Sequence, residues 1–210
     1  MNAATLRQEF SISRYPLALT GAGISVASGL PTFDIAWKGV PVREILTRDF
    51  FFAKPEMFFE LYREILEWTN ATPNAAHKVL ASYDATIITQ NIDGLHGKAG
   101  SKNVLEMHGN LRILNCESCQ KQYASDKVIG EKMPYCSCGQ MLKPDVVLFG
   151  DAIHDWEQAI KQAEKCDLML VIGTSLQVAP VNMLPAIAQR NNAKVVIINE
   201  DCESLFKELL

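Results

Sequence analysis

Four of the six cysteines in this 210-residue chain are grouped in one segment, and their spacing constrains the fold more than any other feature. Cys116 and Cys119 form C-x2-C, sixteen residues follow, and Cys136 and Cys138 form C-x-C. Two such knuckles can hold Zn²⁺ in a closed tetrahedral site, with each sulfur about 2.3 Å from the metal. The second knuckle is one residue shorter than usual, and a lost or redox-active site is the alternative. The sequence therefore predicts a structural zinc site in a small module.

Short apolar runs alternate with helical periodicity along the rest of the chain. This alternation predicts an α/β fold, a Rossmann-like parallel sheet with helices on both faces and right-handed crossovers. The expected buried parallel strands lie at 15–20, 85–89, 103–106, 145–149, 168–172 and 194–198, and the expected helices at 55–68, 73–83, 155–165 and 181–189.

Two stretches interrupt the alternation, one helical and one containing the cysteines. We expect both to be insertions that form a smaller lobe packed against the sheet domain. The expected division is 1–35, 84–111 and 144–210 for the Rossmann-like domain, 36–83 for the helical insertion and 112–143 for the zinc-binding module.

Charge and hydropathy exclude several classes of function. The formal net charge is -4 and no run of Lys and Arg occurs, so nucleic acid is not an expected partner. No apolar run approaches about 18 residues, and the N-terminal segment lacks a basic stretch followed by a long apolar one. We therefore expect no membrane span and a cytoplasmic location.

The segment TGAGIS follows the first expected strand. Gly21 and Gly23 remove side chains where a strand turns into a helix, which lets backbone N–H groups face a diphosphate. A plain tight turn explains the same residues. An ordinary dinucleotide site would also add a third glycine at closer spacing and an acidic residue about 20 positions later.

Polar side chains follow the next two expected strands. Gln90, Asn91 and Asp93 come after one strand, and His108 comes after the next. Ligands bind at the carboxyl ends of strands in open α/β sheets, so these side chains are candidates for a binding site. Asx turns that cap the loop, and a structural role for the histidine, are the alternatives.

These segments together resemble the sirtuin family of NAD-dependent protein deacylases. The resemblance runs from Tyr15 to about Glu200 and includes GAGIS, GLPTF, PNAAH, TQNIDGLH, EMHGN, the four cysteines, KPDVVLFGD, GTSLQV and IINE. It implies NAD as co-substrate, structural Zn²⁺, and acyl-lysine proteins or peptides as substrates.

The resemblance also implies roles for individual residues. His108 would be the general base and Asn91 would assist catalysis, while Val147, Phe149 and Gly150 would bind the substrate as an added strand. The implied cofactor-binding residues are Gly21, Ala22, Gly23, Ser25, Phe33, Gln90, Asn91, Ile92, Asp93, Gly173, Thr174, Ser175, Asn199 and Glu200.

The implied reaction starts when the acyl oxygen of the lysine attacks C1′ of the nicotinamide ribose and nicotinamide leaves. His108, with an ordinary pKa near 6.5, then helps to deprotonate a ribose hydroxyl, which attacks the alkylimidate formed in the first step. Water finally releases free lysine and acyl-ADP-ribose. ADP-ribosyl transfer or NAD hydrolysis, and an NAD-sensing module with little catalysis, are the other interpretations.

One position departs from the family pattern. Asp34 stands in GLPTFD where the family has an arginine, and a carboxylate near a diphosphate is repulsive. Lys38 or Arg43 could replace that arginine. If the charge of Asp34 opposes the diphosphate, Asp34→Arg should lower the KM for NAD, and less so at high salt. An unchanged or raised KM would contradict this prediction.

The acyl preference is predicted from one helix. Family members that take acidic acyl groups share a Tyr-x-x-Arg pair, whereas here Tyr62 is followed three positions later by Ile65. Arg63 should face another side of the helix. We therefore expect acetyl or longer neutral acyl groups.

Overall fold

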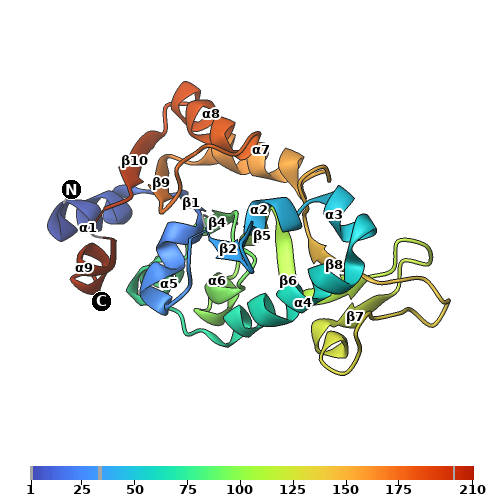
Figure 1. The fold of residues 1–210 in the computed structure, drawn as a ribbon. Coiled ribbons are helices and arrows are strands. Elements are labelled where there is room, and N and C mark those ends of the chain that lie inside the picture. Colours follow the sequence, from blue (N-terminus) through green and yellow to red (C-terminus); the bar gives the residue numbers. More distant parts are fainter. Residues whose placement is uncertain (1, 33–34, 201) are drawn as a thin grey trace.

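A parallel sheet forms the centre of the larger part of the molecule (Figure 1). The computed structural model describes residues 2–32, 35–200 and 202–210. Over these residues the sheet has five strands in the order β10-β9-β1-β4-β5, all parallel to their neighbours. The strands are β1 (Pro16–Thr20), β4 (Thr86–Thr89), β5 (Val104–Glu106), β9 (Leu168–Ile172) and β10 (Lys194–Ile198).

Helices cover both faces of this sheet because its central strands are apolar on both sides. In β9, Leu170 packs into one core and Met169 into the other. The first core includes α1 (Ala3–Ile12), α5 (Ala75–Ser82) and α9 (Cys202–Lys207), and the second includes α7 (Trp156–Lys165), η4 (Val181–Met183) and α8 (Leu184–Arg190). The expected Rossmann-like architecture is confirmed.

A third core belongs to the smaller part of the molecule. There β6 (Gly109–Asn115) pairs antiparallel with β7 (Gln122–Ala124) and β8 (Lys143–Val146). Apolar side chains of α4 pack against this sheet, and Cys116 and Cys136 lie in the same core. The other elements here are β2 (Ala36–Trp37), β3 (Val40–Pro41), α2 (Val42–Ile45), α3 (Arg48–Ala53), α4 (Pro55–Leu66), η2 (Glu67–Asn70) and η3 (Ser125–Val128).

Two details of the sequence-based expectation differ from the structure. The parallel strand expected at 145–149 is wrong, because β8 covers Lys143–Val146 and pairs antiparallel with β6 in the small sheet. The side chain of Asp145 helps to hold β8 against β6. Its carboxylate accepts hydrogen bonds from the side-chain amides of Asn110 and Asn115, which both lie in β6. In addition, α5 packs with α1 and α9, although we expected it in the helical insertion. The rest of the division into lobes stays a prediction.

Among the described residues, no helix is both long enough and apolar enough to cross a membrane.

Candidate functional site

A cavity of about 610 Å³ opens where the carboxyl ends of the parallel strands meet. The chain leaves β1 toward β4 on one side and β9 toward β10 on the other, so the loops after β1 and β9 diverge. Such a switch point is where open α/β sheets bind ligands, and the volume suits a small-molecule site. The predicted residues that line it are Gly21, Ala22, Gly23, Gln90, Asn91, Ile92, His108, Val147, Phe149, Gly150, Gly173, Thr174, Ser175 and Asn199.

Three predicted residues in the part of the chain that the structure describes do not line this cavity. Ser25 and Asp93 are buried directly behind it, and Glu200 is exposed at the end of β10. Phe33, together with the departure at Asp34, lies outside the described residues.

The glycines of the first loop permit a close approach of two backbones. Gly23 donates its N–H to the carbonyl of Gly173 over 2.8 Å. A Cβ at Gly23 would lie 2.7 Å from Gly173 Cα, and one at Gly173 would lie 2.2 Å from Ile24 N. Backbone atoms cannot yield as a flexible side chain can, so both positions require glycine. The loop continues into the 3₁₀ helix η1 (Ala22–Ser28) rather than into an α-helix.

The loop after β9 is held by Asn199, which follows β10. The amide oxygen of Asn199 accepts from Thr174 N at 3.2 Å, and its Nδ2 donates to Thr174 O at 3.1 Å. The Thr174 hydroxyl in turn donates to Gln90 Oε1 at 2.8 Å. The resemblance implied that Asn199 binds the cofactor, and in this structure its side chain clamps the neighbouring turn.

Asn91, Ser25 and Asp93 form a buried polar network. Asn91 Nδ2 donates to Ser25 Oγ at 3.1 Å, and Ser25 Oγ donates to Asp93 Oδ2 at 2.8 Å. Asp93 Oδ1 accepts from the backbone N–H of Leu95 at 2.9 Å. Both oxygens of this buried carboxylate therefore have a hydrogen-bond donor. The Asx turn that was the alternative interpretation is therefore present, and it belongs to the same network.

His108 lies half-buried at the cavity wall. Its Nδ1 is 3.0 Å from the carbonyl oxygen of Gln90, which can only accept, so Nδ1 carries the proton. Nε2 is then the nitrogen with a lone pair available for a base. Burial lowers the pKa of His108, partly opposed by the Gln90 carbonyl, and nearby His154 lowers it further. The imidazole is thus neutral at pH 7 and able to accept a proton.

The segment that follows β8 forms another part of the cavity wall. Val147 N donates to His108 O at 2.9 Å, and Phe149 N donates to Leu46 O at 2.9 Å. Phe149 O accepts from Arg48 N at 3.1 Å. Because these backbone groups are already paired, an incoming peptide would have to use other groups of this wall. The Phe149 side chain is half exposed.

Sequence reasoning missed several cavity residues. Leu46 and Asp151 line the cavity, and so do the neighbours Gln177 and Val178. Leu46 belongs to the insertion, where no strand end marked a site. Gln177 and Val178 stand in the quoted GTSLQV segment, which was the available signal.

The two cations considered as substitutes for the missing arginine differ in position. Arg43 lines the cavity. Lys38 pairs with Glu60 at 2.7 Å and lies over the Trp37 ring, so it is held on the helical insertion. Of the two, Arg43 is the better candidate because it lines the cavity.

Tyr62 and Arg63 connect the helical insertion to the zinc-binding module. Tyr62 is buried, and its hydroxyl donates to Leu111 O and also contacts Ser125 Oγ. Arg63 Nη1 donates to the carbonyls of Glu131 and Lys132. Neither side chain lines the cavity, in agreement with the expectation that Arg63 faces elsewhere.

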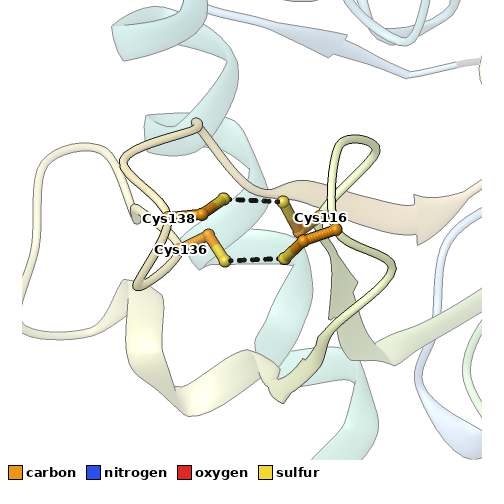
Figure 2. A group of neighbouring side chains, drawn as sticks. Cys116, Cys136 and Cys138 are labelled. Carbon is orange, nitrogen blue, oxygen red and sulfur yellow. Dashed lines mark hydrogen bonds between the residues drawn. The ribbon is translucent and has the colours of Figure 1, made fainter.

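The four cysteine sulfurs converge in the small lobe (Figure 2), where all lie within 4.8 Å of one another. The separations are 3.5 Å for Cys116 and Cys138, and 3.4 Å for Cys119 and Cys136, too long for disulfides. Four sulfurs at about 2.3 Å from one zinc ion would lie about 3.8 Å apart. Backbone N–H donation from Cys138 and the Tyr123 hydroxyl lower the pKa of Cys136 to about 5. The donor set fits a structural zinc ion.

Comparisons with known proteins agree with this geometry. A family model described as "Sir2 family" matches residues 21–180. A protein of Sulfolobus acidocaldarius named NAD-dependent protein deacetylase is 43% identical over 197 residues, covering 87% of this chain and 78% of that protein. One of the same name from Oceanobacillus iheyensis is 40% identical over 201 residues, covering 90% and 85%.

Solved structures show the same relationship. A Sir2 protein bound to a propionylated peptide superposes with a TM-score of 0.90 at 32% identity, and 100% of this chain and 97% of that chain are covered. A Sir2 complex with a peptide and NAD⁺ gives the same values.

Proposed function

The chain belongs to the Sir2 family, and we propose that it removes acyl groups from protein lysines with NAD as co-substrate and His108 as general base. The observation that carries the proposal is His108 at the cavity wall, with Nδ1 used by the Gln90 carbonyl and Nε2 left as the base. The side chain is thereby fixed in the tautomer that the reaction needs.

The cavity fits NAD. The close contact between Gly23 and Gly173 keeps side chains out of the space between the loops after β1 and β9, and backbone N–H groups at such loops suit a diphosphate. Gly21, Ala22 and Gly23 would hold the diphosphate, and Gly173, Thr174, Ser175 and Asn199 the adenosine half.

NAD supplies an electrophilic C1′ and a leaving group, nicotinamide. Asn91 and Asp93 would hold the nicotinamide end, since their network keeps the 91–93 segment in one conformation at the cavity wall. After nicotinamide leaves, His108 Nε2 would take a proton from a ribose hydroxyl. The carbonyl of Gln90 then stabilises the imidazolium through Nδ1–H.

The substrate would be an acyl-lysine in an extended peptide. Val147, Phe149 and Gly150 line the cavity, with Val147 N hydrogen-bonded to the backbone carbonyl of His108, and Gln177 and Val178 also line it. The apolar side chains of Ile92 and Val147 suit a neutral acyl chain. We propose acetyl or longer neutral acyl groups rather than acidic ones.

The zinc ion would be structural. Cys116, Cys119, Cys136 and Cys138 supply a complete tetrahedral shell, which leaves no position for a substrate. The thiols are not paired as disulfides, and this supports a reducing, cytoplasmic location.

The test is incubation with NAD and an acetyl-lysine peptide, followed by mass spectrometry. We expect nicotinamide, O-acetyl-ADP-ribose and the free lysine peptide in equal amounts. Nicotinamide release that does not depend on the peptide would indicate NAD hydrolysis instead. A succinyl-lysine peptide processed faster than the acetyl one would refute the proposed acyl preference.

A further inference from the structure

A buried pair of histidines lies behind the cavity, and the chemistry above does not use it. His77 is on α5 and His96 is on α6 (Leu95–Lys98), with ring centroids 4.8 Å apart. The two residues are 0% and 2% exposed. Burial lowers the pKa of His77 to about 4 and that of His96 to about 3, so both rings are neutral at pH 7.

His96 begins a chain of hydrogen bonds that ends at the Asn91 backbone. Its Nε2 is 3.0 Å from Thr20 Oγ1, and the Thr20 hydroxyl donates to Thr89 Oγ1 at 2.8 Å. Since the single hydroxyl proton of Thr20 goes to Thr89, Nε2 of His96 carries the proton and donates. Thr89 Oγ1 also accepts from Asn91 N at 3.0 Å. We call His96, Thr20 and Thr89 the His96 relay.

His77 is connected to the other side of the same network. Its Nδ1 is 3.0 Å from Asn74 Oδ1, which also accepts from Ala76 N. The Asn74 amide nitrogen donates to Ile24 O at 2.7 Å and to Ser28 Oγ at 3.0 Å. Asn74 therefore fixes η1, the helix that carries Ser25.

Both connections converge on the residues assigned to the nicotinamide pocket. The relay holds the backbone of Asn91, and η1 carries Ser25, which joins Asn91 to Asp93. We propose that the His77–His96 pair is a positioning element that holds the 91–93 segment and η1 in the geometry needed to bind nicotinamide. This inference rests on the proposed function, because that function assigns nicotinamide to this pocket.

A role in packing alone does not explain the pair. Among the described residues, His77 Nε2 and His96 Nδ1 are buried without a hydrogen-bond partner. An unpartnered buried polar atom costs about 1–3 kcal/mol, so two leucines would give a cheaper core. Where a sequence leaves buried polar atoms without hydrogen-bond partners, it usually does so near a functional site. The partnered nitrogens of both rings lead to the pocket.

Matched variants separate positioning from packing. His96→Leu removes the donor and keeps an apolar volume, whereas in His96→Gln the amide nitrogen takes the place of Nε2–H. Thr89→Val removes the acceptor of Asn91 N without a change of shape. Ser125→Ala is the control, because it removes a buried, hydrogen-bonded hydroxyl in the small lobe, away from the cavity. His77→Leu and His77→Asn form the corresponding pair for the second connection.

The measurements are KM for NAD, kcat, the inhibition constant of nicotinamide and the melting temperature. In His96→Leu and Thr89→Val we expect KM and the nicotinamide constant to rise about fivefold or more, the effect of one buried hydrogen bond, with a smaller change in kcat. His96→Gln should restore both constants, and Ser125→Ala should lower only the melting temperature. The double variant His96→Leu with Thr89→Val should add little to either single change, because both break one relay.

Calorimetry with NAD and with nicotinamide keeps this test independent of turnover. If His96→Leu and Thr89→Val bind both ligands within about twofold of the wild type, the positioning role is refuted. The same holds if His96→Gln is as impaired as His96→Leu. A wild-type protein that binds both ligands but forms no acyl-ADP-ribose would refute the deacylase function and leave the positioning role standing.

Discussion

His108 and Asp93 are both assigned to the proposed site but are held by different partners, so their substitution should have different effects. His108 contacts the protein through Nδ1 and the Gln90 carbonyl, and none of the Asn91 network depends on it. His108→Ala should therefore keep NAD affinity, while deacylation falls about 100-fold or more, as expected for the loss of a general base. Calorimetry measures the NAD affinity, and product analysis measures the deacylation rate. Near-wild-type deacylation by this variant would refute the proposed mechanism.

Asp93→Asn should instead weaken binding. The carboxylate accepts from the Ser25 hydroxyl and from Leu95 N, and an amide offers only one acceptor atom. We expect the affinity for NAD and for nicotinamide to fall about tenfold, the cost of leaving one buried donor unpaired. Unchanged nicotinamide inhibition in this variant would show that Asp93 does not shape the pocket.

The pH dependence of catalysis should follow His108. Burial lowers its pKa below 6.5, so the base stays neutral to a lower pH and the acid limb of kcat/KM should lie below pH 6.5. His154 also lowers this pKa, so His154→Gln should raise it and move the acid limb to higher pH. Above pH 7 the two proteins should agree. An acid limb that stays in place would mean that another group controls it.

Single residues show what sequence could and could not predict. The sequence predicted that His108, Asn91 and the glycines lie at one site, because strand ends meet at one edge of a parallel sheet. All of them line the cavity. The clamp that Asn199 makes on Thr174 was not predicted, because the sequence does not tell whether a side chain faces a ligand or its own backbone. The roles of the individual residues stay predictions.

At the scale of elements, the loops after β1 and β9 act as one unit. Gly23→Ala would place Cβ 2.7 Å from Gly173 Cα, and the loops would have to separate. Overpacking costs about 1–3 kcal/mol, so NAD affinity should fall about tenfold or more. Gly130→Ala is the control, because nothing lies within 4 Å of a Cβ there. Equal NAD affinity in the two variants would show that the contact is not needed.

The elements that the sequence predicted best are the strands that form short apolar runs. The strands β1, β4 and β9 are short apolar runs that are almost wholly buried, and the edge strands β5 and β10 are short, mostly apolar runs that are partly exposed. The run at 145–149 has a similar composition, but hydrogen bonds from β6 hold Asp145, and these are not visible in a local pattern. Similarly, the sequence placed α5 by its neighbours in the chain, whereas its apolar face packs against the sheet.

At the scale of the whole molecule, the cavity has walls from the sheet, with its two cores, and from the separate core of the smaller part. The loops after β1, β4, β9 and β10 extend from the sheet, whose cores contain Ile172 and Val171. The other wall contains Leu46 and Val146, which pack in the same core as Cys116. The zinc site is therefore connected through one core mainly to the wall assigned to the peptide, and it reaches the residues assigned to NAD only through Ile92.

Loss of zinc should consequently affect the two substrates unequally. Cys116→Ala removes one of four ligands, and metal binding supplies folding free energy to a module of this kind, so zinc content should fall and the segment 112–143 should lose protection from hydrogen exchange. As the core around Leu46 loosens, the Phe149 wall loses its support, and KM for the acetyl peptide should rise more than the Kd for NAD. Cys166→Ala is the matched control, because Cys166 is buried in a core of the sheet. Wild-type protein with well below one zinc per chain, or equal losses for both substrates, would contradict this coupling.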